Sequence, residues 1–188
     1  MTPRLLILAL GFTLTAAAAI APTAANAQVF WSSAATGCVP SRPSIANRTY
    51  QESAGSVRFR ITAAGTPFVT GTITLRCPVQ VGRTVSSAWS LGLNLYFLGT
   101  DATQGYFAGA VLKATNKVTG VTTDLLSASS VSSAPTTSFT QPTKIGSVKL
   151  GLDLDLETNL HWIELTLNRT GGARNPTIFG VELAVAPQ

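Results

Sequence analysis

The sequence predicts an all-β fold: an antiparallel β-sandwich of eight or nine strands with jelly-roll topology. Apolar and polar residues alternate with a period of two in the apolar segments after Gln28, which is typical of strands that bury one face. Charged residues make up only 11% of the chain, and its 16 glycines and many serines and threonines disfavour a helical bundle. Two antiparallel sheets that each keep one face in water pack as a sandwich, and a closed barrel is the alternative.

Residues 1–27 are predicted to be a secretory signal peptide. Arg4 precedes an apolar run from Leu5 to Ile20, and an A-x-A sequence at 25–27 ends the segment, which is the order of such a peptide. A membrane anchor is the alternative, but the run is shorter than the roughly 20 residues that a spanning helix needs. We therefore expect a secreted or periplasmic protein without a membrane span after cleavage.

The segment 28–55 is expected to be irregular, because Pro40 and Pro43 interrupt any regular element. It contains Cys38, and the other cysteine of the chain is Cys77. An even number of cysteines in an exported protein predicts one disulfide, with two buried free thiols as the alternative. The bond would tie this segment to a sandwich domain over 56–188, and a closed loop of about 40 residues would contribute roughly 4 kcal/mol of stability.

The first strands of the domain are predicted over 56–62, 69–79 and 88–98. In each, apolar residues hold one parity and polar residues the other, as a half-buried strand requires. In 88–98 the inward positions carry Trp, Leu and Phe, so Tyr96 is expected to face outward.

A hairpin is predicted from 106–115 and 121–126, joined by a short loop that contains Gly120. The stretch 127–143 follows, in which ten of 17 residues are Ser or Thr. We expect a long surface loop here, with a short strand near Phe139. A flexible linker between two domains is the alternative.

The last strands are predicted over 148–156, 161–168 and 178–185. Leucines occupy every second position from Leu150 to Leu156, which places the acidic residues between and after them on the outer face. In the final strand Phe179 shares the inward parity with Val181, so Glu182 is expected to face outward.

The order of short motifs resembles a group of small exported bacterial proteins of unknown function. The motifs are GCVP at 37–40, IANRTY at 45–50, GSVRF at 55–59, GTITLRCPV at 71–79, WIELTLNR at 162–169 and IFGVEL at 178–183. They are a cysteine pair and strand patterns rather than a catalytic signature. The resemblance implies the β fold, the Cys38–Cys77 disulfide and a bacterial source, and it implies no activity.

The acidic residues Asp153, Asp155 and Glu157 are the sharpest candidate for chemistry. Residues on one face of a strand lie about 6.6 Å apart, a spacing at which paired carboxylates can hydrolyse glycosides. The row resembles the Glu-x-Asp-x-Glu strand of a jelly-roll glycosidase family, except that Asp153 replaces the nucleophilic Glu. A calcium site is another alternative. We expect a solvated strand face with no catalytic residue, and little effect of Asp155→Asn on stability.

The remaining candidate residues are a histidine, the basic residues and three aromatic residues. The single histidine, His161, has no visible companions for a catalytic triad, and no zinc motif or cofactor motif is present. Without Arg4 the 13 basic residues become 12, against 8 acidic ones, and they are scattered, so we expect no nucleic-acid partner. Tyr96, Tyr106 and Trp162 have the parity opposite the leucine-rich core and are the candidate ligand-binding residues.

These observations predict a non-enzymatic exported protein that binds carbohydrate or another cell-surface ligand, an expectation that rests on analogy of fold. A structural or adhesive subunit that pairs strands with its own copies is the first alternative. A glycoside hydrolase that uses the acidic row is the second. The oligomeric state is left open.

Overall fold

A computed structural model describes residues 28–46, 50–61, 69–81, 89–171 and 174–187. The predicted signal peptide at 1–27 lies outside the described residues. In this part of the chain, no helix is both long enough and apolar enough to cross a membrane.

The described residues form eleven strands and four short helical segments. The strands are β1 (Gln28–Ala34), β2 (Val39–Pro40), β3 (Tyr50–Ser53), β4 (Ser56–Phe59), β5 (Gly71–Pro78), β6 (Trp89–Leu98), β7 (Tyr106–Asn116), β8 (Thr122–Ser129), β9 (Thr143–Leu150), β10 (Asn159–Arg169) and β11 (Thr177–Pro187). The helical segments are α1 (Arg42–Ala46) and α2 (Ser130–Ser133), with 3₁₀ turns η1 (Ala35–Gly37) and η2 (Ala102–Gln104).

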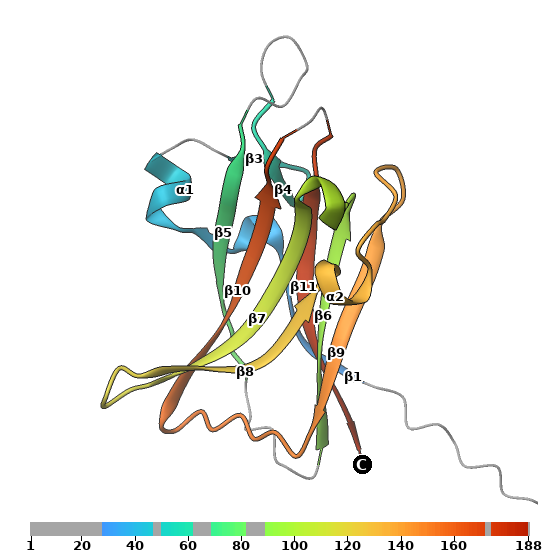
Figure 1. The fold of residues 1–188 in the computed structure, drawn as a ribbon. Coiled ribbons are helices and arrows are strands. Elements are labelled where there is room, and N and C mark those ends of the chain that lie inside the picture. The colour runs from blue at the N-terminus through green and yellow to red at the C-terminus, as the bar shows by residue number, and fades with distance from the viewer. Residues whose placement is uncertain (1–27, 47–49, 62–68, 82–88, 172–173, 188) are drawn as a thin grey trace, which may run out of the picture.

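The strands form two antiparallel sheets that pack face to face, so the predicted β-sandwich is confirmed (Figure 1). One sheet has the order β3-β4-β11-β6-β9, with β1 added beside β11, and the other has the order β2-β5-β10-β7-β8. From β4 to β11 each step along the chain passes to the opposite sheet, except the β7–β8 hairpin. The resulting strand orders, β4-β11-β6-β9 in one sheet and β5-β10-β7-β8 in the other, are those of a jelly roll.

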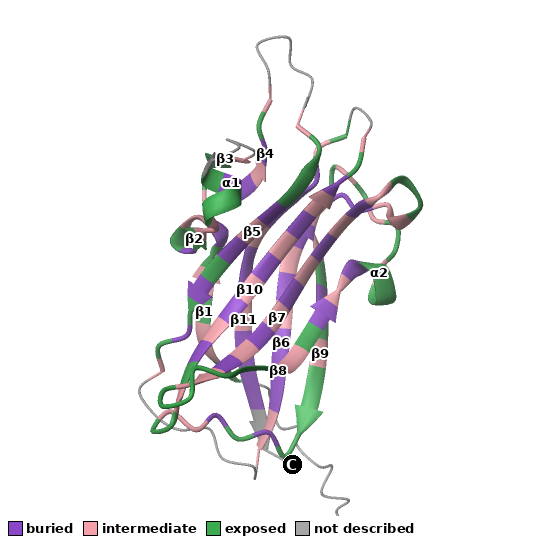
Figure 2. Cartoon of the chain, turned by 60° about the vertical axis from the view of Figure 1, so that its left-hand side comes forward, coloured by how far each residue is buried: buried purple, intermediate pink, exposed green. Residues whose placement is uncertain are grey.

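The core lies between the sheets, where buried and outward residues alternate along the strands (Figure 2). β10 is the centre of the five-stranded sheet, since it pairs along its length with β7 and also with β5. On its inner face Ile163 and Leu165 are fully buried. Burial of such side chains stabilises the fold by about 1.5–3 kcal/mol each relative to exposure.

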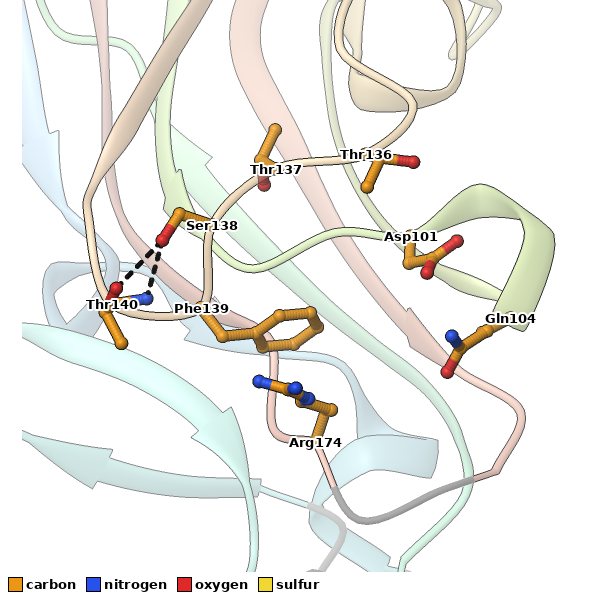
Figure 3. Close-up of a pocket in the computed structure, with 8 residues that line it drawn as sticks. All are labelled: Asp101, Gln104, Thr136, Thr137, Ser138, Phe139, Thr140 and Arg174. Carbon is orange, nitrogen blue, oxygen red and sulfur yellow. Dashed lines mark hydrogen bonds between the residues drawn. The ribbon is translucent and has the colours of Figure 1, made fainter.

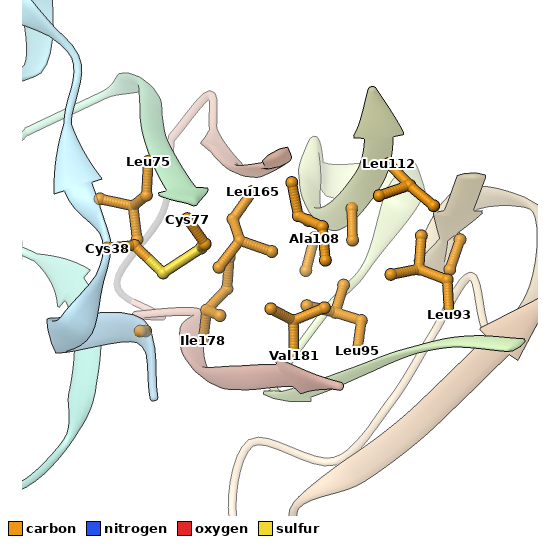
Figure 4. Close-up of a cluster of buried hydrophobic side chains, with 14 of the residues drawn as sticks. Cys38, Leu75, Cys77, Leu93, Leu95, Ala108, Leu112, Leu165, Ile178 and Val181 are labelled. Carbon is orange, nitrogen blue, oxygen red and sulfur yellow. A yellow bond between two sulfur atoms is a disulfide. The ribbon is translucent and has the colours of Figure 1, made fainter. Parts of the chain in front are cut away.

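The Cys38–Cys77 disulfide is present and lies at the edge of this core (Figure 4). Cys77 belongs to β5, and Cys38 lies just before β2, which pairs with β5 through Val39 and Pro40. The segment 28–55 is more regular than the sequence predicts, because β1 pairs with β11 and β3 pairs with β4. The strands of this segment, β1, β2 and β3, raise the number above the expected eight or nine.

The predicted strand over 148–156 is wrong in its extent, since β9 covers only its first three residues, and wrong in the parity of those residues. β9 ends at Leu150, and Gly151 follows with a φ of 64° that breaks the extended backbone. Val148 and Leu150 are 68% and 69% exposed, so they lie on the outer face. Lys149 instead has the inward parity, since it pairs with the buried Leu91.

Two further expectations need correction. Phe139 lies in an irregular loop between α2 and β9 and not in a short strand. In β11 a bulge between Ile178 and Gly180 reverses the parity, so Ile178 is buried and Phe179 is half-buried. The outward position predicted for Glu182 is nevertheless correct, because it pairs with Asn94 on the polar face of β6.

Candidate functional site

The outer face of the six-stranded sheet has a hollow of about 220 Å³ beside Tyr96. Tyr96 projects from β6, and β11 contributes Phe179 and Glu182 to the lining. The third wall comes from β1, where Ser32 pairs with Glu182 on the outer face, whereas the Ser33 hydroxyl lies on the inner side, 3.6 Å from Cys38 Sγ. Three strands that are distant in sequence therefore place two aromatic rings, a carboxylate and the Ser32 hydroxyl around one depression.

The hollow depends on the bulge in β11. Gly180 lies opposite Tyr96, and the residue before it is the extra one that the partner strand does not match. A Cβ atom on Gly180 would lie 2.5 Å from the carbonyl oxygen of Ser33, which is closer than real Cβ contacts come. Glycine at this position therefore lets β1 approach β11 closely enough to form the third wall.

A polar network holds the carboxylate of Glu182 in place. Asn94 Nδ2 donates to Glu182 Oε1 at 2.9 Å, and Lys144 Nζ donates to the same oxygen at 3.1 Å. Lys144 Nζ also lies 5.4 Å from the centre of the Tyr96 ring, within the range of a cation–π contact. The side chain of Glu182 is only 14% exposed, so its position is well defined before any ligand arrives.

The network also sets the ionisation of its members. Burial alone would raise the pKa of Glu182, but hydrogen bonds from Tyr96, Lys144 and Asn94 outweigh it and lower the pKa. The pKa of Tyr96 is raised by burial and by its hydrogen bond to Glu182, and that of Lys144 is raised by hydrogen bonds to Tyr96 and Glu182. At neutral pH the site therefore combines an ionised acceptor, an ammonium donor and a neutral phenol.

Trp162 lies on the outer face of the opposite sheet, so it does not join Tyr96. Its indole nitrogen donates to Thr115 Oγ1 at 3.1 Å. Arg76 and Lys113 lie 5.0 and 5.7 Å from the ring centre, and Lys113 also pairs with Asp124 at 2.7 Å. The ring is thus already engaged by two cations.

Tyr106 is not on an outer face, contrary to the sequence-based expectation. It is 1% exposed, because the alanines at 108, 110 and 114 and Leu112 of the same parity form the buried side of β7. The Tyr106 hydroxyl donates to the carbonyl oxygen of Gly171. Its role in the structure is to support the loops at the end of the sandwich.

The three acidic residues lie in the loop between β9 and β10 and do not form a row on a strand. Asp155 closes a turn, since its Oδ1 accepts from the backbone nitrogens of Glu157 at 2.9 Å and Thr158 at 3.2 Å, and its Oδ2 accepts from the Thr158 hydroxyl. These bonds, that from the Thr158 hydroxyl first, lower the pKa of Asp155. No group of three or more metal-ligating side chains occurs within the described ranges.

His161 is 6% exposed near the start of β10. Burial lowers its pKa, and the attraction of Asp155 only partly offsets this effect. Its Nδ1 has no hydrogen-bond partner among the atoms that the structure describes. The imidazole is therefore neutral near pH 7.

The alternation of residues in β6 indicates Tyr96, but no sequence pattern indicates the side chains that surround it. Lys144 and Glu182 reach Tyr96 only through the pairing of β9 and β11 with β6, which no local pattern reveals. Phe179 was assigned to the core because the bulge was not recognised. The change of apolar parity between Ile178 and Val181 is the signal that could have found it.

The chain matches no family model and no curated protein. Among solved structures it is similar to Eiger TNF from S. frugiperda, with 18% identity and a TM-score of 0.35 over 69% of this chain and 68% of that chain. It is also similar to the CBM22-1 xylan-binding domain from Paenibacillus barcinonensis Xyn10C, with 10% identity and a TM-score of 0.35 over 88% and 99%. At these identities and TM-scores the likenesses assign no family to the chain.

Proposed function

We propose that the protein is an exported, non-enzymatic β-sandwich that binds carbohydrate in the hollow beside Tyr96. The observation that supports this proposal is the grouping of two aromatic side chains, Tyr96 and Phe179, with the carboxylate of Glu182. A sugar ring presents apolar C–H faces and a rim of hydroxyls. Aromatic rings and fixed polar groups are the complementary chemistry.

The network around Glu182 favours a hydroxylated ligand over a charged one. The carboxylate charge is already balanced by Lys144 at 3.1 Å, so a cationic ligand would have to displace that ion pair. A neutral ligand hydroxyl can donate to the carboxylate without displacing that ion pair. The hollow, at about 220 Å³, is smaller than the roughly 300–1,000 Å³ of drug-sized pockets, which favours one sugar unit of a longer chain.

Two features support export. The predicted signal peptide at 1–27 directs the chain out of the cytoplasm, and the Cys38–Cys77 bond is consistent with an oxidising compartment. A secreted or periplasmic location gives the protein access to surface polysaccharides.

A self-pairing structural subunit is the second candidate, because edge strand β9 carries the exposed apolar residues Val148 and Leu150. Lys149 weighs against it. Its Nζ donates to the carbonyl oxygen of Leu125 in β8, a strand of the other sheet, at 3.3 Å. An inward-pointing charge on an edge strand opposes the addition of another strand.

The proposal is tested by a glycan-array screen of the purified protein, followed by calorimetric titration of the glycans that bind. Tyr96→Leu and Glu182→Gln are each expected to weaken binding by about tenfold or more. Trp162→Leu is the matched control, because it removes an aromatic ring from the opposite sheet, and it should leave affinity unchanged.

Melting curves of the three variants establish that they fold. If no glycan binds the wild type, or if only Trp162→Leu abolishes binding, the hollow beside Tyr96 is not a carbohydrate site. Release of reducing sugars by the wild type would contradict the non-enzymatic part of the proposal.

A further inference from the structure

A second pocket lies among the loops at one end of the sandwich, and it shares no lining residue with the hollow beside Tyr96 (Figure 3). Its volume is about 370 Å³. Three connections meet there: the β6–β7 loop, the loop between α2 and β9, and the loop before β11. The lining residues are Asp101, Gln104, Thr136, Thr137, Ser138, Phe139, Thr140 and Arg174.

Phe139 is the fixed wall of this end pocket. Its ring meets Tyr106 edge-on, with the centroids 5.8 Å apart and the planes at 84°. It also packs directly over Gly99, where a Cβ atom would overlap the ring. The buried Tyr106 thus positions a ring that would otherwise be a mobile loop side chain.

Arg174 lies against this wall, with its guanidinium carbon 5.1 Å from the centre of the Phe139 ring (Figure 3). The backbone of Arg174 is anchored by Arg169, which is 1% exposed. Arg169 Nε donates to the carbonyl oxygen of Arg174 at 3.0 Å, and its Nη1 donates to the carbonyl oxygen of Val69 at 2.7 Å. The ring contact and the anchored backbone orient the guanidinium at the pocket.

The charge of Arg174 is not neutralised by a carboxylate within the described residues, whose ion pairs all involve lysines. Asp101 lines the same pocket but forms no ion pair with Arg174. Its Oδ1 accepts from the Thr103 nitrogen at 3.1 Å and from the Thr103 hydroxyl at 2.6 Å. Its other oxygen has no hydrogen-bond partner in the described part of the chain.

We propose that the end pocket binds a hydroxylated carboxylate, the chemistry of a sugar acid. The Arg174 guanidinium pairs with the ligand carboxylate through two parallel N–H bonds, the geometry for which arginine is suited. The amide of Gln104, the hydroxyl of Thr136 and the second oxygen of Asp101 receive the ligand hydroxyls. The site is independent of the hollow beside Tyr96.

The proposal is tested by calorimetric titration of the purified protein with D-glucuronate, D-glucose and glycine at low ionic strength. Glucuronate should bind, and neutral glucose should bind this pocket at least about tenfold more weakly. Arg174→Gln should lower glucuronate affinity by at least about tenfold. Arg174→Lys should have an intermediate effect, because lysine keeps the positive charge but lacks the two parallel N–H donors of the guanidinium.

Arg42→Gln is the matched control, since it removes one positive charge from an exposed position on α1 and leaves the pocket intact. Glucuronate should shift the amide resonances of residues 136–140, and Tyr96→Leu should not alter its affinity. Equal binding by wild type and Arg174→Gln would overturn the proposal. Binding of glycine without glucuronate would replace the sugar acid by a zwitterionic ligand and would also overturn it.

Discussion

Loss of the Cys38–Cys77 disulfide should destabilise the whole sandwich. The two cysteines are separated by 39 positions in the sequence. For a closed loop of this length, the chain-entropy relation gives a loss of about 13 cal/mol/K in the conformational entropy of the unfolded chain. At 25 °C this loss destabilises the unfolded chain by roughly 4 kcal/mol. For a chain of this size, 4 kcal/mol corresponds to a fall in Tm of about 8–16 °C.

The assay compares oxidised protein, reduced protein and the double variant Cys38→Ala/Cys77→Ala in urea and in thermal melts. Both cysteines are buried, at 4% and 0% exposure, so alanine is preferred to serine because it introduces no buried hydroxyl. The double variant loses two sulfur atoms from the core in addition to the bond, so its unfolding free energy should fall slightly further than that of reduced wild type.

Hydrogen exchange separates a global effect from a local one. β2 is tied to β5 by only two register pairs, those of Val39 and Pro40, so this segment should open first on reduction. If the unfolding free energies of oxidised and reduced protein agreed within about 1 kcal/mol, the loop-entropy reasoning would be refuted. Loss of protection in 38–41 alone, with β10 unchanged, would show that the bond stabilises only the N-terminal segment.

Three further changes test particular elements. Asp155→Asn should lower Tm at pH 7. Hydrogen bonds hold the Asp155 pKa below its unfolded value of about 3.9, so the ionised carboxylate stabilises the fold above that pH. This stabilisation is lost as the pH falls through the folded pKa. Identical curves of Tm against pH for wild type and variant would contradict the prediction. Lys149→Leu should increase the mass measured by light scattering over that of the wild type, because it removes the charge from edge strand β9. Gly99→Ala should cost about 1–3 kcal/mol in urea unfolding, more than Gly120→Ala, because both have positive φ but only Gly99 lies under the Phe139 ring.

Sequence periodicity was sufficient to predict most of the strands. β5, β6 and β10 lie within or close to the predicted segments, because apolar side chains fill most of their inward positions. β7 shows where apolar periodicity fails to predict the buried face of a strand. Its inner face is mostly alanine, and small residues do not distinguish the buried face from the outer one, so Tyr106 was given the wrong parity.

The alternation from Val148 to Leu156 misled for a different reason. Leucines recur at every second position, but the strand ends at Leu150, and Leu152 and Leu154 are buried from a loop after the turn at Gly151. Leucine is also tolerated at exposed positions, as Leu150 shows. Period-two patterns therefore do not fix where a strand ends or which of its faces is inward.

The acidic loop illustrates the consequence for site prediction. The assignment of Asp153, Asp155 and Glu157 to one outer face depended on a strand that does not extend so far. Asp155 instead bonds the backbone of its own turn, a role that aspartate takes in loops. The expectation that Asp155→Asn has little effect on stability is therefore replaced by the prediction of a lower Tm.

The bulge at Phe179 links the fold to the candidate site beside Tyr96. Before it, Ile178 pairs with Phe97 and both are buried; if that register continued, Glu182 would lie opposite Leu93, inside the core. The extra residue shifts the register by one, so Glu182 pairs with Asn94 on the outer face instead. Because a shift of one residue exchanges the two faces of a strand, a single bulge moves the carboxylate to the outer face of the sheet and also places Phe179 beside Tyr96. The site is therefore a property of the pairing register of β11.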